Sequence, residues 1–461
     1  MKNIYLTNYS VKGIKTLDEP VSLSFYKKTI TKNPETQEYN IKGIYGTNGS
    51  GKSAIISSVD ILRNILTDSQ YLSNPLVQKN LDEIVNKRLK ELYIKAEYIV
   101  DVEDGPVVFT YSVTLSKDNT EKYVISKENL LFRMAASKIE TAKKIFEIVN
   151  GEIITLYEEN GHDEFYTDVV NKTMNLLTMS SMNTLFYEKF ISPAIKQGNK
   201  KGVIYNQLWA GTSALCAFGR KLHVYLDQSD EHKEYVALNT AKLFYNKEDY
   251  NEKMHILVNN LLYMNNDLID VLQVTQNVIP KWYYKKFQSI VDKLYNFLHI
   301  FKADLQKIEI DKKENKDSLI CDLVMVYDGY KVNAEYESTG IKKLIKLFAY
   351  INEMVQGGIV FIDELDSNLH DVYLCALLEY LMEYGQGQLC FTTHNVGPMD
   401  VLKRNKKSID FLSDNHKIYP WRTNGNYSPS KLYRSGMIEG SPFNVDLTDF
   451  ISVFGSGVED E

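Results

Sequence analysis

Residues 46–53 read GTNGSGKS, and this short segment constrains the fold more than any other part of the sequence. It fits the pattern G-x-x-x-x-G-K-[ST], follows the strand-like run IKGIY and precedes the run SAIISSVDILRNIL, which has helical spacing. Glycines allow the tight turn, and amide groups at a helix start point at phosphate oxygens. The segment therefore predicts a phosphate-binding loop in a parallel α/β sheet. The residues expected to contact the nucleotide are Gly46, Asn48, Gly49, Ser50, Gly51, Lys52 and Ser53.

Two adjacent carboxylates, Asp363 and Glu364, follow a second apolar run, GIVFI. Ligands of parallel sheets bind beyond the carboxyl ends of the strands, so we expect both acids near the loop. Asp363 and Ser53 are expected to hold Mg²⁺, because this hard cation prefers oxygen ligands. Glu364 is expected to polarise the attacking water, and Lys52 to reach the β and γ phosphates. Adjacent acids at this place favour hydrolysis of ATP.

Two further segments complete the predicted site. The run QLCFTTHN ends near His394, which could contact the γ phosphate and the water. In ESTGIKKLI, Ser338 and Gly340 precede a helix, where a hydroxyl and backbone amides are available to an anion. The alternative for His394 is a structural role at a strand end. The alternative for Ser338 is an ordinary helix cap.

The order of strand-like and helical segments predicts an α/β protein with a mixed sheet and an antiparallel β lobe. We divide the chain into three parts: 1–130, the first part of an ATPase head; 131–305, a mainly helical insertion; and 306–461, the second part of the head. The insertion is expected to include KTMNLLTMSSMNTLFYEKFI and YNEKMHILVNNLLYMNNDLIDVL, whose apolar residues recur at helical spacing. No heptad is sustained there, so a long coiled-coil arm is not expected.

Composition indicates a folded protein, with 44% hydrophobic and 25% charged residues. The first residues lack the features of a signal peptide, and no apolar stretch has the length of a membrane span, so we expect a cytoplasmic protein with no membrane contact. The net charge of −7 does not indicate a nucleic-acid partner. The four cysteines show no metal-binding spacing and are expected to be reduced core residues. Two basic clusters are interpreted as solvated loops: Lys403, Arg404, Lys406 and Lys407; and Lys196, Lys200 and Lys201.

The loop, the Ser338 segment, the acidic pair and the His394 strand, together with DELDSNLH after the pair, resemble the OLD-type subgroup of ABC ATPases. The resemblance covers residues 1–65 and 320–400. It implies a homodimer or higher homo-oligomer whose heads sandwich ATP, with each ATP held by Lys52 of one chain and Ser338 of the other. Asp366 would lie in the loop that crosses this interface. Asp371 and Ile341 stand where members commonly have Pro and Thr.

OLD proteins often continue into a nuclease domain, but the segment after His394 is too short for one. The resemblance therefore extends to standalone ATPases of antiphage systems such as PARIS, Septu and AbiL. Our leading hypothesis is a regulatory ATPase that controls a separate effector, a nuclease. The second hypothesis is a DNA-repair ATPase like RecF or the SMC heads. The third is a scaffold that binds ATP without hydrolysing it. We expect ATP and Mg²⁺ as cofactors.

Overall fold

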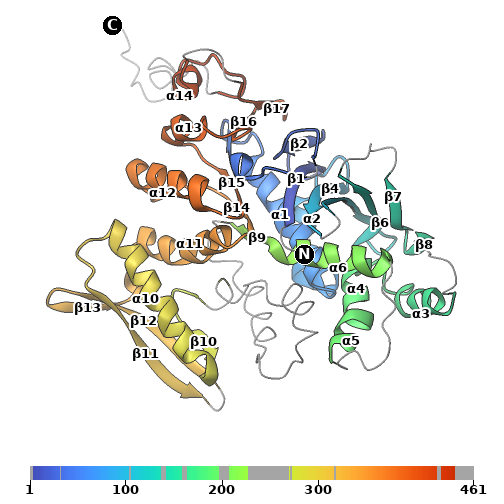
Figure 1. Ribbon diagram of the computed structural model, residues 1–461, viewed down its shortest axis with the longest axis horizontal. Helices are drawn as coiled ribbons and strands as arrows, with labels where there is room; N and C mark the ends of the chain where they lie inside the picture. Colours follow the sequence, from blue (N-terminus) through green and yellow to red (C-terminus); the bar gives the residue numbers. More distant parts are fainter. Residues whose placement is uncertain are drawn as a thin grey trace, which may run out of the picture.

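The computed structural model contains a central, mainly parallel sheet, a large antiparallel sheet beside it and a smaller antiparallel sheet at one end (Figure 1). This arrangement confirms the predicted α/β class with an antiparallel lobe. Among the described helices, none has the length and apolarity to cross a lipid bilayer. The structure describes residues 4–31, 33–102, 105–135, 142–157, 163–196, 207–226, 269, 272–315, 318–422 and 427–441.

The central sheet carries the phosphate loop. Its described strands have the order β17-β16-β3-β15-β14-β9, in which β17 is antiparallel and the others are parallel. The parallel strands are short continuous apolar runs, as expected for a sheet buried on both faces. β15 lies between β3 and β14, so the phosphate loop and the acidic pair flank its carboxyl end. The strands are β3 (Ile41–Tyr45), β9 (Leu222–Tyr225), β14 (Ile359–Ile362), β15 (Gln388–Thr392), β16 (Ile409–Leu412) and β17 (Ile418–Pro420).

Helices cover both faces of this sheet. Because side chains alternate along a strand, Ile359 and Phe361 of β14 pack into the cluster formed with α1 and α6. Val360 and Ile362 of the same strand pack into the cluster formed with α11 and α12. The helices are α1 (Lys52–Thr67), α6 (Gln207–Lys221), α11 (Thr339–Val355), α12 (Asp371–Tyr384) and α13 (Gly397–Leu402).

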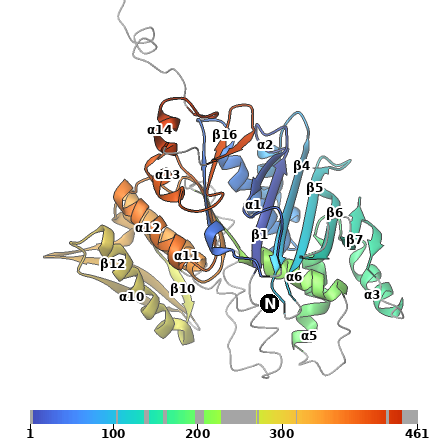
Figure 2. The same cartoon turned by 45° about the horizontal axis from the view of Figure 1, so that its top comes forward.

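The large antiparallel sheet lies against α1 and α6 (Figure 2). Its described order is β2-β1-β4-β5-β6-β7-β8. Gln388 of β15 ties this sheet to the central one, since its side-chain amide accepts from Leu6 N at 2.6 Å and donates to Leu6 O at 2.9 Å. The strands are β1 (Ile4–Lys12), β2 (Val21–Ser24), β4 (Glu91–Val100), β5 (Val107–Lys117), β6 (Tyr123–Met134), β7 (Lys143–Val149) and β8 (Glu152–Leu156).

Short helical elements surround this lobe. The helix α4 begins after the cap residue Ser181, whose side chain accepts a hydrogen bond from Thr184 N. Along the chain, all of these short helical elements fall between β2 and α6. They are the 3-10 helices Gln37–Tyr39 and Tyr71–Ser73, α2 (Pro75–Ile84), α3 (Asp163–Thr173), α4 (Met182–Phe186), a π-helix (Tyr187–Ile191) and α5 (Ser192–Lys196).

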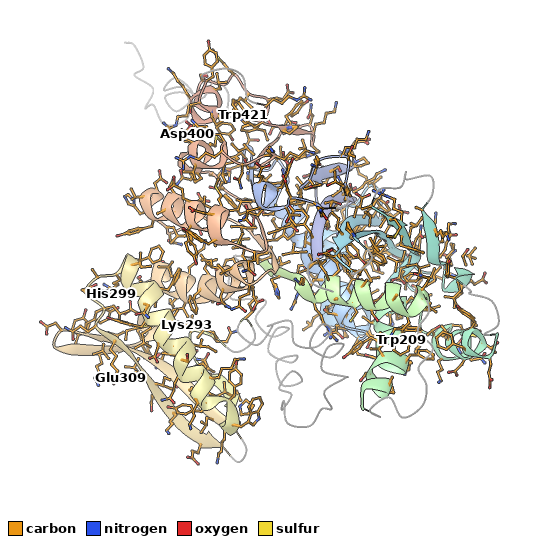
Figure 3. All side chains as sticks on the ribbon, in the orientation of Figure 1. Trp209, Lys293, His299, Glu309, Asp400 and Trp421 are labelled. Carbon is orange, nitrogen blue, oxygen red and sulfur yellow. The ribbon has the colours of Figure 1, made fainter. Side chains whose placement is uncertain are left out.

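The small sheet at the other end has the described order β10-β12-β11, with β13 paired to β12. Figure 3 labels Lys293 and His299 on α10, the helix that covers this sheet, and Glu309 on β11. The helix α11 packs into this core through Leu344 and Phe348, so it joins the small sheet to the central one. The elements are β10 (Asn277–Pro280), the 3-10 helix Lys281–Tyr283, α10 (Tyr284–Phe301), β11 (Lys307–Asn315), β12 (Ser318–Tyr327), β13 (Tyr330–Asn333) and the 3-10 helix Ala334–Tyr336.

The last described helix, α14 (Pro429–Arg434), is tied to α13. Asp400 of α13, labelled in Figure 3, accepts hydrogen bonds from Ser428 at 2.6 Å and from Ser430 at 2.5 Å. Because Ser428 also caps the helix, one carboxylate fixes both the start of α14 and its place on the molecule.

The region 131–305, which was expected to be mainly helical, also contributes strands to the three sheets. Its described residues include the strands β7, β8, β9 and β10, and β9 belongs to the central sheet. A four-residue run such as LHVY is too short for periodicity to distinguish a strand from a helix. Most of YNEKMHILVNNLLYMNNDLIDVL lies outside the described residues, as do Lys200 and Lys201. The three-part division of the chain stays a prediction.

Candidate nucleotide-binding site

The phosphate loop joins β3 to α1, and two of its glycines are required by geometry. A Cβ on Gly46 would lie 2.3 Å from Leu412 O, too close for any side chain. Gly51 caps α1 with φ of 106°, in the left-handed region that glycine alone adopts freely. Gly49 also has a positive φ, of 83°. The loop thus makes a tight turn directly before α1.

Lys52 is buried at the first position of α1. Its ammonium donates to Gly46 O and Thr47 O, both at 2.9 Å, and an ammonium has three donors in all. Burial lowers the pKa of Lys52, and the negative charges of Asp363 and Glu364 oppose that shift. The lysine is therefore held inside the loop, close to the acidic pair.

Asp363 and Glu364 follow β14, and a threonine of the neighbouring strand organises them. Thr392 donates its hydroxyl proton to Asp363 Oδ1 at 2.6 Å and accepts from Glu364 N at 2.8 Å. Asp363 is 9% exposed, whereas the side chain of Glu364 is exposed. The first acid is therefore fixed in the protein and the second can reach a reactant in solvent.

His394 lies just beyond β15, between the loop and the acids. Its side chain is exposed, yet partial desolvation lowers its pKa, and the positive charge of Lys52 lowers it further. The carboxylates of Asp366, Glu364 and Asp363 act in the opposite direction. The electrostatic influence of these groups on one imidazole shows that the structure brings the phosphate loop, the acidic segment and the His394 segment to one edge of the sheet.

Ser338 and Gly340 lie at the start of α11. Ser338 Oγ accepts from Ile341 N at 3.4 Å, so the residue is a helix cap, as the alternative reading had it. Its side chain is exposed, and a Cβ on Gly340 would lie 3.4 Å from Asn368 O. This helix end therefore packs on the loop that carries Asp366 and leaves its hydroxyl open to solvent.

Two buried polar atoms in or near the loop lack a hydrogen-bond partner in the described part of the chain. Among the described residues, Ser50 Oγ and Asp366 Oδ1 are buried without a hydrogen bond. A buried hydroxyl or carboxylate in this state costs free energy, and such atoms in a phosphate loop and beside it fit a site that takes a nucleotide with its cation. Ser53, in the first turn of α1, and Asp363 supply the oxygens that Mg²⁺ prefers.

The sequence did not point to several residues that contact the loop. Asp414 accepts a hydrogen bond from Thr47, and His416 Nδ1 lies 3.0 Å from Ser50 O. Both belong to the turn between β16 and β17, far from the motifs along the chain. Thr392 stood inside the quoted strand QLCFTTHN, but its role becomes visible only once β15 is seen beside β14.

The structure also shows the surroundings of the cysteines, of Tyr5 and of the 403–407 cluster. All four cysteines are free, and three are buried. Tyr5 is buried and donates to Tyr39 O at 2.8 Å, a core role. The 403–407 cluster is neutralised locally: Lys403 pairs with Asp400, Arg404 with Glu379 and Lys406 with Glu38, while Lys407 donates to Ser24 Oγ and Tyr26 O.

A phosphate loop, an acidic pair and a histidine at one edge of a parallel sheet resemble the nucleotide site of P-loop ATPases of the AAA/ABC-like class. Residues 248–400 match the family model described as AAA domain, putative AbiEii toxin, Type IV TA system. The chain is 23% identical over 414 residues to the Retron Vc95 probable ATPase of Vibrio cholerae serotype O1 biovar El Tor, which covers 85% of this chain and 73% of that protein. These matches confirm the resemblance to an ATPase family.

Two solved structures are also similar to this chain. Each is 12% identical in sequence and covers 91% of this chain. One is the recombination mediator protein RecF of the RecFOR pathway, matched over 99% of its chain with a TM-score of 0.37. The other is the SMC head domain from Thermotoga maritima, matched over 100% of its chain with a TM-score of 0.33.

Proposed function

We propose that this protein hydrolyses ATP at sites that are completed by a second copy, and that it regulates a separate effector in an antiphage system. The observation that carries the proposal is the meeting of Lys52, Asp363, Glu364 and His394 at one edge of the sheet. Transfer of a phosphoryl group to water requires a lysine that binds phosphate, an acid that binds a cation and an exposed acid that orients the water.

Each residue has one task in this reaction. Lys52 and the loop amides bind the β and γ phosphates, and Ser53 with Asp363 holds Mg²⁺, which neutralises phosphate charge. Glu364 orients the water and accepts its proton. His394, kept neutral by its lowered pKa, can hydrogen-bond the water or the γ phosphate without adding charge.

The need for a second copy follows from Ser338. Ser338 and Thr339 are exposed at the start of α11, and the start of a helix favours an anion. Two chains facing each other would place that end on the partner's γ phosphate, with Asp366 between the sites. The regulatory role rests on the motif resemblance and on the similarity to a retron ATPase.

The test uses Lys52→Ala and Glu364→Gln, with Lys331→Ala as a surface control. Lys331 is an exposed lysine that pairs with Glu309 at 2.6 Å on the small sheet. Lys52→Ala should lose ATP binding. Glu364→Gln should keep binding, lose turnover by about 10²- to 10⁴-fold and accumulate as an ATP-bound dimer in size-exclusion chromatography. Phosphate release by wild type no faster than by Glu364→Gln would instead support the scaffold hypothesis.

The biological half of the proposal has its own test. The protein should co-purify with the product of a neighbouring gene, and protection of cells against phage should be lost in both variants. Full protection by both variants would remove the antiphage role. Salt-sensitive binding to duplex DNA that weakens on charge reversal of Lys403 and Arg404 would favour the RecF-like alternative.

A further inference from the structure

A buried lysine joins the helix that carries Ser338 to the backbone of Glu364. Lys343 lies in the second turn of α11 and is 5% exposed. Its ammonium donates to Glu364 O at 2.6 Å and to Ser367 Oγ. It also lies 5.9 Å from the ring centre of Tyr225, at the end of β9. One side chain therefore contacts the catalytic turn and the neighbouring strand at once.

The turn that Lys343 holds is a strained one. Glu364 has φ of 49°, a left-handed conformation that is unfavourable for a residue with a side chain and persists only when surrounding contacts impose it. Those contacts are present: Thr392 Oγ1 accepts from Glu364 N, and Glu364 O accepts from Ser367 N at 3.1 Å as well as from Lys343. Lys343 supplies the charged contact at the carbonyl side of the turn.

The same helix begins at Ser338. The first turn of α11 packs on the segment after Glu364, where Gly340 approaches Asn368. A shift of this helix end along its axis therefore moves the Lys343 ammonium relative to Glu364 O. Because packed elements move between discrete arrangements rather than deforming continuously, such a shift would change the direction of the Glu364 side chain.

We propose that Lys343 is a positioning residue that couples the two ATP sites of a dimer. This inference rests on the proposed function, in which Ser338 of one chain contacts the ATP bound by its partner. Engagement of Ser338 seats α11, and Lys343 then fixes Glu364 of the same chain for attack on that chain's own ATP. Each site becomes competent only when the other is filled.

The test compares Lys343→Met, Lys343→Arg and Lys221→Met with wild type. Lys221 is a matched control, because it is also buried and donates to a backbone carbonyl, Gly357 O at 2.9 Å, just beyond the opposite end of α11. Steady-state turnover is measured against ATP concentration, and ATP affinity is measured with a fluorescent analogue at protein concentrations where dimers do not form. Thermal denaturation verifies that each variant is folded.

In wild type we expect a Hill coefficient above 1. Loss of one hydrogen bond from a charged donor predicts a fall in kcat of about 10- to 100-fold in Lys343→Met, with the Hill coefficient near 1 and monomer affinity for ATP unchanged. Lys343→Arg should recover part of both kcat and cooperativity, and Lys221→Met should keep both. If folded Lys343→Met has wild-type kcat and cooperativity, the coupling role of Lys343 is refuted and the proposed ATPase function is not affected.

Two other outcomes are distinct from that one. If wild type shows no turnover above Glu364→Gln, the proposed ATPase function fails and the coupling fails with it. If Lys343→Met does not fold, Ser367→Ala decides the question, because it removes one acceptor of the Lys343 ammonium and leaves the lysine in place. Wild-type kcat and cooperativity in folded Ser367→Ala would also overturn the inference.

Discussion

Replacing Glu128 by glutamine should remove a pH dependence of stability that this residue imposes on the antiparallel lobe. Glu128 lies on β6, is fully buried, and accepts hydrogen bonds from Tyr111 OH at 2.8 Å and Met182 N at 2.9 Å. Burial raises its pKa from 4.5 to about 7, although both hydrogen bonds act in the opposite direction. The folded protein therefore binds this proton more tightly than the unfolded chain does.

The sign and size of the effect follow from that difference. Between pH 4.5 and 7 the folded state carries more protons, so stability falls as pH rises and the loss is complete above pH 7. A shift of this size corresponds to about 3 kcal/mol, of which about 2 to 3 kcal/mol develops between pH 5 and pH 8. Glutamine keeps the shape, can still accept from Met182 N and cannot ionise, so the variant lacks this loss.

The assay is urea unfolding at several pH values between 5 and 8, followed by the fluorescence of Trp209. This residue is 5% exposed, is labelled on α6 in Figure 3, and contacts Phe186 of α4, the helix that begins at Met182. The stability gained by the variant should grow as pH rises. Glu152→Gln, at an exposed glutamate of the same sheet, is the control. A gain that is equal at pH 5 and pH 8 would refute the reasoning.

Two other perturbations test the packing around the site. Gly46→Ala should displace the phosphate loop and abolish measurable ATP binding while the protein stays folded, because the added Cβ would lie 2.3 Å from Leu412 O; isothermal titration with ATP measures this, and retained affinity would show that the loop can relax. Asp410→Asn should destabilise the protein by about 3 to 5 kcal/mol in urea unfolding, because it leaves the charge of Lys42 buried. The two side chains are 1% and 3% exposed and lie 2.8 Å apart, and replacing both by apolar residues should restore most of that stability.

Local sequence determined the chemistry of the candidate site. GTNGSGKS specifies a loop whose backbone geometry requires glycines. The apolar run before it and the helical run after it support this prediction. The runs GIVFI and QLCFT were identified as buried strands, and β14 and β15 confirm this. These elements could be predicted because each is encoded within about ten residues, in a pattern whose physical cause is local.

The secondary structure of a short run was predicted less well where it depends on a strand that is distant in the sequence. The strand β9 was included in a helical region, although it forms the edge of the central sheet. A run of four residues can be buried in a helix or in a strand, and here the conformation is decided by pairing with β14, from a distant part of the chain.

Only the tertiary structure decided how the site is held. Thr392 organises the acidic pair from a neighbouring strand, Asp414 contacts the phosphate loop from a later turn, and Lys343 reaches the carbonyl of Glu364 from another helix. Nothing near these residues in the sequence marks them, since a threonine, an aspartate and a lysine are ordinary in strands, turns and helices. Their roles depend on hydrogen bonds between segments far apart in the chain, and such contacts exist only after the sheet has brought the segments together.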